Sequence, residues 1–434
     1  MRIAVIGLGV SGCVAARLLA TRHDVVLYDS NPNPGGHALT VDVDRHGQRV
    51  AVDVGFMVFN TRTYPNFCRM LDMLGVASRA SDMSFSVRDP QRDFEYQGSG
   101  LRGLFAKRAN ALSPSFWRMI GDILRFNQGG CNAVRLGLPA NQSVGEFLQA
   151  GRFSPGFVHD YLVPMAAAIW STRPSDVFDY PAKFLIGFFA NHGLLQLRNR
   201  PQWRTIVGGS RRYVEPLLAD LRDRLHLADP VARVRRGPAG FKVETLCGDV
   251  GEFDEVVFAC HADQTLRIFP DATDDEADTL TAFPYQPNQA VLHTDQSRLP
   301  ARRDAWASWN YCLSADRTTP ATVTYDLGRL QGVVEPGELL LSLNETEQID
   351  RQKVLKTFEF SHPAYTMQSI AAQSRWATIS GRAGAHFCGA YWGYGFHEDG
   401  VNSALRVAKQ FGIGLEACTA ACTKEPSPTT VAIR

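Results

Sequence analysis

A glycine-rich turn interrupts the apolar stretch IAVIGLGVSGCVAARLLA near the N-terminus, and few folds can accommodate it. Ile3 to Ile6 are typical of a buried parallel strand, and Ser11 to Ala20 of a helix. The glycines between them follow the spacing G-x-G-x-x-G and are Gly7, Gly9 and Gly12. Such a turn lets a diphosphate approach backbone N–H groups at a helix N-terminus, where the partial positive charge favours an anion.

Two other interpretations of the stretch fit less well. A basic residue before an apolar run also outlines a signal peptide, but the glycines would weaken a lone helix. The second alternative is a tight turn that binds nothing. Against it, a second strand, DVVLYD, follows and ends at Asp29, 17 residues after Gly12. An acid at this place accepts hydrogen bonds from the ribose of a dinucleotide, so strand, glycines, helix, strand and acid together indicate a dinucleotide site.

Composition excludes several classes of protein. The 434 residues, 45% of them hydrophobic, are enough for two or three domains. Lys plus Arg number 45 and Asp plus Glu 44, so there is no global charge to attract nucleic acid. Nine scattered cysteines without a C-x-x-C pair predict reduced thiols, no metal site and a cytoplasmic location.

We predict an interleaved organisation of two domains. The nucleotide-binding domain is expected to comprise three segments, 1–81, 203–285 and 378–420. The substrate domain is expected to comprise a helical segment and a sheet-rich segment, 82–202 and 286–377. Residues 421–434 are polar and typical of a disordered tail.

Further motifs follow the first in a set order. They are paired glycines in GGHALT, D-x-G in DVGFMVFN, paired glycines before a helix in VGGSRRYVEPLL, and a glycine-rich loop before the last helix in GAYWGYGFHEDGVNSA. This order resembles the flavin-dependent amine oxidase and phytoene desaturase superfamily. With TYPNF and PNQAVLHTD added, it is similar to a bacterial branch of predicted NAD/FAD-binding oxidoreductases. The resemblance implies an α/β fold: a Rossmann-like, glutathione-reductase-like FAD-binding domain interleaved with a mixed α+β substrate domain.

The resemblance also implies that FAD binds in an extended form, with its ring near the last helix. Val231 would contact the adenine through its backbone, and Gly400 and Val401 would open a helix whose N–H groups stabilise negative charge on the reduced ring. The full set of expected cofactor contacts is Gly7, Gly9, Val10, Ser11, Gly12, Asp29, Ser30, Gly36, His37, Ala38, Gly55, Phe56, Val231, Gly389, Glu398, Gly400 and Val401.

The chain departs from the superfamily pattern at three points. His37 stands where amine oxidases usually have Arg, Gly389 is followed by Ala390 instead of an acid, and we find no equivalent of the lysine near the flavin. These departures argue against amine oxidation. No second G-x-G-x-x-G opens a helix, so a reductase with two dinucleotide sites is not expected either.

The loop YWGYGFHEDG supplies the candidate catalytic residues. Tyr394 and His397 lie directly before the last helix, where Tyr394 could line the flavin and His397 could exchange a proton with substrate. The alternative is that the aromatic residues are core and His397 caps backbone groups. The remaining histidines are dispersed and are expected to be structural: His159, His192, His261, His293 and His362.

Residues 101–127 are rich in basic and apolar side chains. Phe116, Ile120, Ile123 and Leu124 fall on one face of a predicted helix, and the segment carries five basic residues against Asp122 alone. This pattern is typical of a helix on an anionic membrane surface, and equally of a helix that packs on its own domain.

The apolar stretches YLVPMAAAIW and FLIGFFANHGLLQL favour a small hydrophobic substrate. Because relatives in this branch are often encoded near enzymes that modify fatty acyl chains, the resemblance adds lipid chemistry. We therefore predict an FAD-dependent oxidoreductase that removes hydride from a hydrophobic substrate, with fatty-acyl chains as candidates. The alternatives are an amine oxidase that produces hydrogen peroxide, a redox-neutral flavin isomerase and a non-catalytic flavoprotein. The sequence leaves the oligomeric state open.

Overall fold

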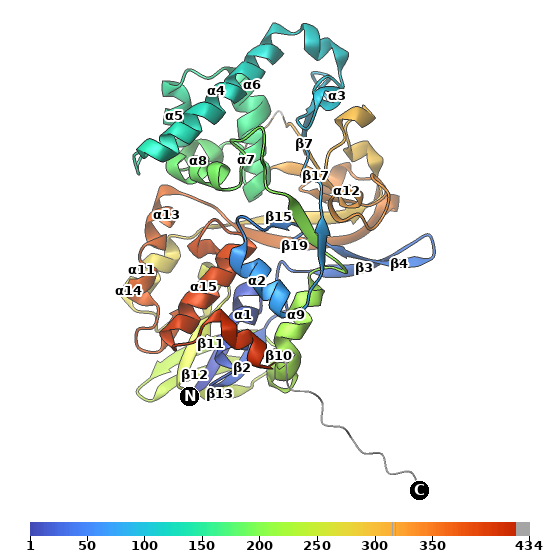
Figure 1. Cartoon of the computed structure of the whole chain (residues 1–434). Coiled ribbons are helices and arrows are strands. Elements are labelled where there is room, and N and C mark those ends of the chain that lie inside the picture. The colour runs from blue at the N-terminus through green and yellow to red at the C-terminus, as the bar shows by residue number, and fades with distance from the viewer. Residues whose placement is uncertain (315, 317, 422–434) are drawn as a thin grey trace.

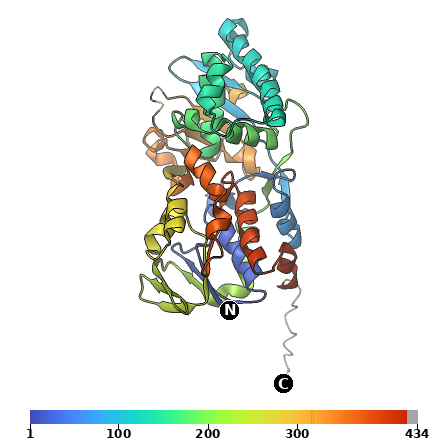
Figure 2. The same cartoon turned by 90° about the vertical axis from the view of Figure 1, so that its left-hand side faces the viewer.

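The computed structural model describes residues 1–314, 316 and 318–421. All but the first residue of the predicted tail, 421–434, lies outside the described residues. The molecule is elongated, with a parallel sheet and the N-terminus at one end and a group of helices at the other (Figures 1 and 2).

The first end is built on a parallel sheet whose strands come from distant parts of the chain. Its order is β10 (Leu225–Leu227), β2 (Asp24–Asp29), β1 (Arg2–Ile6), β14 (Glu255–Phe258) and β20 (Ala385–Phe387). All four pairings are parallel. The order reverses between β1 and β14, and ligands of such sheets bind at the carboxyl ends of the strands at this switch point. The Rossmann-like fold class is thereby confirmed.

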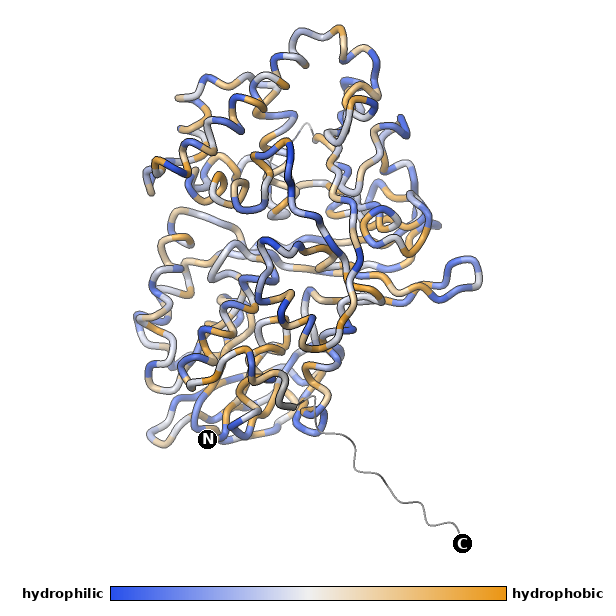
Figure 3. The backbone as a smooth tube through the Cα atoms, in the orientation of Figure 1, coloured by the Kyte–Doolittle hydropathy of each residue, from blue (hydrophilic) through white to orange (hydrophobic). Residues whose placement is uncertain are grey.

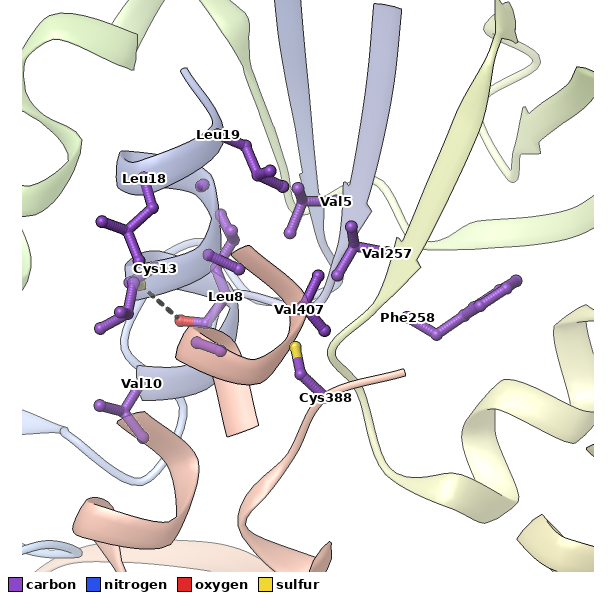
Figure 4. Close-up of a cluster of buried hydrophobic side chains, with 14 of the residues drawn as sticks. Val5, Leu8, Val10, Cys13, Leu18, Leu19, Val257, Phe258, Cys388 and Val407 are labelled. Atoms are coloured by element: carbon purple, nitrogen blue, oxygen red, sulfur yellow. Dashed lines mark hydrogen bonds between the residues drawn. The ribbon is translucent and has the colours of Figure 1, made fainter. Parts of the chain in front are cut away.

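Two helices from opposite ends of the sequence pack together on this sheet. They are α1 (Val10–Leu19) and α15 (His397–Gln410). Figure 4 shows the apolar side chains that join them to β1 and β14, among them Leu19, Val257 and Val407. Every residue of α1 is buried, which explains why its sequence lacks the polar face of a surface helix. The remaining strands of this end form an antiparallel sheet of β11 (Val231–Gly237), β12 (Gly240–Thr245) and β13 (Val250–Phe253).

A second large sheet forms the middle of the molecule. Its order is β19 (Val354–Pro363), β15 (Tyr285–His293), β18 (Leu340–Leu343), β17 (Thr322–Asp326), β16 (Trp309–Cys312), β7 (Phe85–Asp89) and β8 (Phe94–Gln97). The segment 82–202, predicted as helical, therefore begins with two strands. Because β7 pairs with β16 in parallel, about 220 residues further along the chain, no local pattern could show that they belong to this sheet.

Helices cover the far end and connect the sheets. Those of the far end are α3 (Leu101–Leu104), α4 (Pro114–Leu136), α5 (Val144–Ala150), α6 (Pro155–Phe157), α7 (Val163–Trp170) and α8 (Ala182–Asn191). Those nearer the parallel sheet are α2 (Pro65–Met73), α9 (Arg211–Leu218), α10 (Ala262–Ile268), α11 (Asp274–Thr281), α13 (Met367–Gln373) and α14 (Trp376–Ile379). The short helix α12 (Leu327–Gln331) lies beside β17 of the middle sheet (Figure 1). The short strands are β3 (Thr40–Arg45), β4 (Gln48–Asp53), β5 (Phe59–Asn60), β6 (Ser78–Ala80) and β9 (Trp203–Ile206). No helix within the described ranges has both the length and the apolar character to cross a membrane.

Candidate flavin site

The glycines of the first turn have two different roles. Gly7 has a φ of +96°, and a Cβ there would lie 2.7 Å from the Cys260 nitrogen. A Cβ at Gly12 would overlap the carbonyl oxygen of Gly7. These two glycines therefore let β1, α1 and the end of β14 approach one another. A Cβ at Gly9 would have no heavy atom within 4 Å, so the space above Gly9 is open to a ligand.

The first turn of α1 suits an anion. Gly9 precedes the helix, no side chain accepts a hydrogen bond at this cap, and the first turn contains no acid. Free N–H groups and the helix dipole favour a phosphate at such an end. Val10 and Ser11 are the first residues of this turn, so the helix begins one residue before the predicted start at Ser11.

The loop with the second glycine pair lies directly on the first turn. Gly35 donates a hydrogen bond to the Leu8 carbonyl at 2.7 Å. A Cβ on Gly36 would lie 3.0 Å from the Cα of Gly9, and Gly36 is exposed. We call the first turn (7–12), this loop (35–38) and the first turn of α15 the cofactor cradle. The cradle fits a dinucleotide because the open space above Gly9, the exposed Gly36 and free helix N–H groups meet there.

Asp29 and its neighbours lie at the end of β2, beside the first turn. One carboxylate oxygen of Asp29 accepts the Leu8 N–H at 2.6 Å, and the other accepts the Asn31 N–H at 2.8 Å. The Asn31 side-chain amide donates a third hydrogen bond to this carboxylate at 3.0 Å. A carboxylate offers about four lone-pair sites, so about one remains for a ribose hydroxyl. Ser30 is exposed next to it, and Val231, half-buried, begins β11.

The D-x-G motif joins the cradle loop 35–38 to the neighbouring segments at Thr40 and Ser210. The Asp53 carboxylate accepts the Ser210 N–H at 2.8 Å and the Thr40 hydroxyl at 2.6 Å. A Cβ on Gly55 would overlap the carbonyl oxygen of His37, whose oxygen accepts the Phe56 N–H at 2.7 Å. Gly55 therefore serves close packing against His37, and its predicted cofactor contact stays a prediction.

The last helix begins earlier than the sequence predicted. We expected Gly400 and Val401 to open it, but α15 begins at His397 and the Gly400 N–H donates to the Phe396 carbonyl at 3.0 Å. This N–H is therefore not free to stabilise a ligand. A Cβ on Gly400 would lie 2.6 Å from Val10 Cγ1, because the first turns of α1 and α15 touch at this glycine.

His397 is built into the protein interior. Its ring stacks on Phe56 with a centroid distance of 3.4 Å, and its Nε2 lies 2.8 Å from the Tyr213 hydroxyl. Burial lowers the pKa of His397 to about 3, so the imidazole is neutral. The predicted exchange of a proton with substrate is therefore not supported for this residue.

The acids that follow His397 hold neighbouring loops. Both carboxylate oxygens of Glu398 accept backbone N–H groups of α2, from Asn66 at 3.1 Å and Phe67 at 2.9 Å. Glu398 therefore caps α2, and its predicted contact with FAD is not supported. Asp399 accepts the Phe396 N–H at 3.0 Å, and burial raises its pKa to about 7. Asp399 was not among the predicted site residues, although it stands beside them in the sequence.

Tyr394 faces the helical end. The loop that follows Gly389 carries it towards α8, where its ring lies 4.9 Å from Phe184 and 5.4 Å from Phe188. Its carbonyl accepts the Trp170 indole N–H at 3.1 Å. We call the rings gathered here the aromatic wall: Trp170, Phe184, Phe188, Tyr365 and Tyr394. The wall joins three regions that are far apart in the sequence.

Three histidines converge beside the cradle, which the sequence did not reveal. The ring centroids of His37 and His362 lie 5.1 Å apart, and those of His37 and His261 6.4 Å apart. Nε2 of His37 is buried without a hydrogen-bond partner among the described residues. Burial, reinforced by the neighbouring histidines, holds the pKa of His37 well below its usual value, and burial lowers that of His362 to about 4. We had expected His261 and His362 to be dispersed, but the β15–β19 pairing and the end of β14 bring them together.

The comparisons with known proteins agree with this geometry. The family model for flavin-containing amine oxidoreductases matches residues 10–302, more than half of the chain. No curated protein sequence matches the chain.

Several solved structures have a similar fold at low sequence identity. Putrescine oxidase with putrescine bound has 13% identity and a TM-score of 0.67, with 95% of this chain and 99% of that chain covered. Cyclohexylamine oxidase from Brevibacterium oxydans IH-35A has 14% identity and a TM-score of 0.66, with the same shares covered. A CLA-producing fatty acid isomerase from P. acnes has 15% identity and a TM-score of 0.64, with 94% and 98% covered. The chain thus belongs to the family of flavin-containing amine oxidoreductases and is an FAD-dependent oxidoreductase.

Proposed function

We propose that this oxidoreductase removes hydride from a hydrophobic substrate of the fatty-acyl class. The observation that carries the proposal is the aromatic wall together with the three histidines: His362, near the end of β19, stands three residues before Tyr365 of the wall. The wall offers apolar rings, and the histidines offer imidazole groups whose pKa is lowered by burial. FAD, when bound, supplies the hydride acceptor. The protein has to hold a C–H bond of the substrate against it in a dry site.

The aromatic wall suits an acyl chain. Phe184 stacks on Tyr365 at 4.6 Å, and burial keeps the pKa of the Tyr365 hydroxyl well above its usual value, so it stays protonated. This hydroxyl has no hydrogen-bond partner among the described side chains and main chain. Rings of this kind exclude water and contact methylene groups along their faces. In our proposal Tyr394 lines the substrate at the end of the wall closest to the cradle.

The histidines suit an oxygen-bearing head group. His37 follows Gly36 in the cradle, so we assign it to the cofactor. His362 lies on β19 of the middle sheet, and its Nδ1 is 3.0 Å from the side-chain nitrogen of Asn288. Because the amide nitrogen of Asn288 can only donate, Nδ1 accepts, and the neutral imidazole carries its proton on Nε2, which can donate to a substrate oxygen. We assign His362 to the carboxylate or ester oxygen of the substrate, as a positioning residue.

Amine oxidation is favoured less. A cationic amine would need a free carboxylate nearby, but Glu398 and Asp399 both accept backbone N–H groups. A redox-neutral isomerisation of the same substrate class is a second candidate, because the fatty acid isomerase shares the fold. That reaction would use the same wall and histidines.

Anaerobic mixing of the yellow holoprotein with substrates tests the proposal. We expect long-chain fatty acids or phospholipids, but neither putrescine nor cyclohexylamine, to bleach the visible flavin absorbance. Bleaching by the amines alone would overturn the substrate class. If lipids cause no bleaching but emerge from incubation with reduced holoprotein with shifted double bonds, the isomerase reading replaces hydride removal.

A His362→Asn variant sharpens the test. It should raise the lipid concentration needed for half-maximal bleaching several-fold, while the limiting rate and the flavin content stay unchanged. The matched control is His293→Asn, because His293 is also buried on the middle sheet but faces Ser342. Equal effects of both variants would show that His362 has only a structural role.

A further inference from the structure

The helical end of the molecule carries an unusual concentration of exposed apolar side chains. Twelve large hydrophobic residues are exposed among the residues that the structure describes, and six of them lie within residues 101–136. The six are Leu101, Leu112, Trp117, Leu124, Val134 and Leu136. We call the surface that they form the 101–136 face. Isolated exposed apolar residues are normal, but a gathering of this kind marks an interaction site.

The helix α4 has two apolar faces. Phe116, Met119 and Phe126 are buried against the helical core, so the face that the sequence predicted as amphipathic is largely packed. Trp117 and Leu124, seven residues apart, lie together on an exposed side next to the packed face. Leu124, which the sequence grouped with Phe116, Ile120 and Ile123, is exposed, whereas the other three pack on the core. Ordinary packing on the domain therefore explains the first face and leaves the second without a function.

The exposed apolar residues are accompanied by positive charge. Residues 101–136 contain six basic residues and one acid: Arg102, Lys107, Arg108, Arg118, Arg125, Arg135 and Asp122. The acid is buried and pairs with Arg125 at 2.8 Å. The side chains of Arg108 and Arg118 are exposed beside Leu112 and Trp117. Two of these cations pair with exposed acids of neighbouring segments, Arg102 with Asp304 at 3.2 Å and Lys107 with Asp93 at 2.9 Å. An incoming surface therefore meets apolar groups interspersed with cations, some of which are already paired.

The 101–136 face is also well placed for a large flat partner. It lies at the end of the molecule opposite the parallel sheet and the N-terminus (Figure 2). In Figure 3 the tube at this end carries hydrophobic and hydrophilic residues side by side. The 23 residues of α4 extend about 34 Å, so several side chains can touch one plane together.

We infer that the 101–136 face docks the protein on an anionic membrane surface. Leu112, Trp117 and Leu124 would enter the interface between head groups and acyl chains, where Trp is favoured. Arg108 and Arg118 would meet lipid phosphates. Charge complementarity favours the membrane over a second copy of this chain, because two copies of this face would bring like charges together. The inference is independent of the proposed substrate.

Co-sedimentation of the holoprotein with vesicles tests the inference. We expect binding to vesicles of phosphatidylglycerol and phosphatidylcholine, and weak binding to phosphatidylcholine alone. Near a membrane each Lys or Arg contributes about 1 kcal/mol, or about fivefold in binding. The double variant Arg108→Glu with Arg118→Glu should therefore weaken binding more than about tenfold. High salt should act in the same direction.

Two further variants separate specific docking from general adhesion. Trp117→Ser with Leu124→Ser should also lose binding, without loss of flavin. Leu246→Ser with Val250→Ser is the matched control, because both residues are exposed at the opposite end of the molecule, and binding should be unchanged. Equal loss in the control, or equal binding to neutral vesicles, would overturn the inference. So would sedimentation equilibrium showing a dimer that the Trp117 and Leu124 variants dissociate.

Discussion

The cofactor cradle and the aromatic wall specify their residues in different ways. In the cradle, backbone segments approach so closely that a Cβ on Gly12 would overlap the Gly7 carbonyl. In the wall, rings such as those of Phe184 and Tyr394 contact each other at centroid distances near 5 Å. Such rings can shift relative to one another without losing contact. Close backbone contact requires one residue type, whereas ring packing requires only volume and apolarity. The cradle can therefore be recognised in the sequence by glycines at fixed spacing. The wall is visible there only as a high content of aromatic residues.

The largest expected effect comes from two glycines three residues apart. Gly12→Leu should prevent folding, because its side chain would overlap the backbone of the first turn. Gly9→Leu should give a folded but colourless protein, because its side chain would enter the open space proposed for the diphosphate. Circular dichroism and visible absorbance separate the two outcomes. A yellow Gly9→Leu protein would contradict the location of the cofactor.

The wall should tolerate shape changes better than the cradle. Phe184→Ala should lower the free energy of unfolding by about 3–5 kcal/mol, and Phe184→Leu by less than about 1.5 kcal/mol. Denaturant unfolding of both variants measures this difference. Flavin content should stay unchanged in each folded variant, since Phe184 lies outside the cradle. A folded but colourless Phe184→Leu protein would show that the wall, like the cradle, is needed to bind the flavin.

The first turn of α15, within the cradle, should give the stability a pH dependence. Burial raises the pKa of Asp399 from 3.8 to about 7, so the folded protein binds the proton more tightly than the unfolded chain. Stability from this group is therefore lost as pH rises between about 4 and about 7, at most about 4 kcal/mol in total. Asp399→Asn removes this loss, so the melting temperature of the variant should rise relative to the natural protein over that range. If the difference in melting temperature between the two proteins is the same at every pH, Asp399 is not the group responsible.

The smallest effect is expected at His397. His397→Leu would leave the Tyr213 hydroxyl without its partner and cost about 1–3 kcal/mol of stability. Since the neutral, buried imidazole takes no part in our mechanism, the rate of substrate-dependent bleaching should not change. Stopped-flow absorbance of the variant measures this rate. A large loss of rate with flavin retained would restore His397 as a catalytic residue.

Much of the fold and of the cofactor site could be predicted from residue order. The strand from Ile3, the glycine turn and Asp29 are local in sequence, and backbone sterics and helix dipoles act over the same short range. The start of α15 was missed because Asp399 folds back onto the Phe396 N–H, a contact that composition does not reveal. The strands β7 and β8 were missed because their partners lie far along the chain.

Residue types and spacing were thus sufficient for the family, the flavin cofactor and the Rossmann-like fold class, because the strand, glycine turn and acid that identify them are near neighbours in the sequence. Only the tertiary structure brought His37, His261 and His362 together, turned His397 and Glu398 inward, and showed that α4 exposes a second apolar face. Each of these depends on which distant elements pack together. Which distant elements pack together depends on how apolar surface is buried over the whole chain, so no short segment of the sequence determines it.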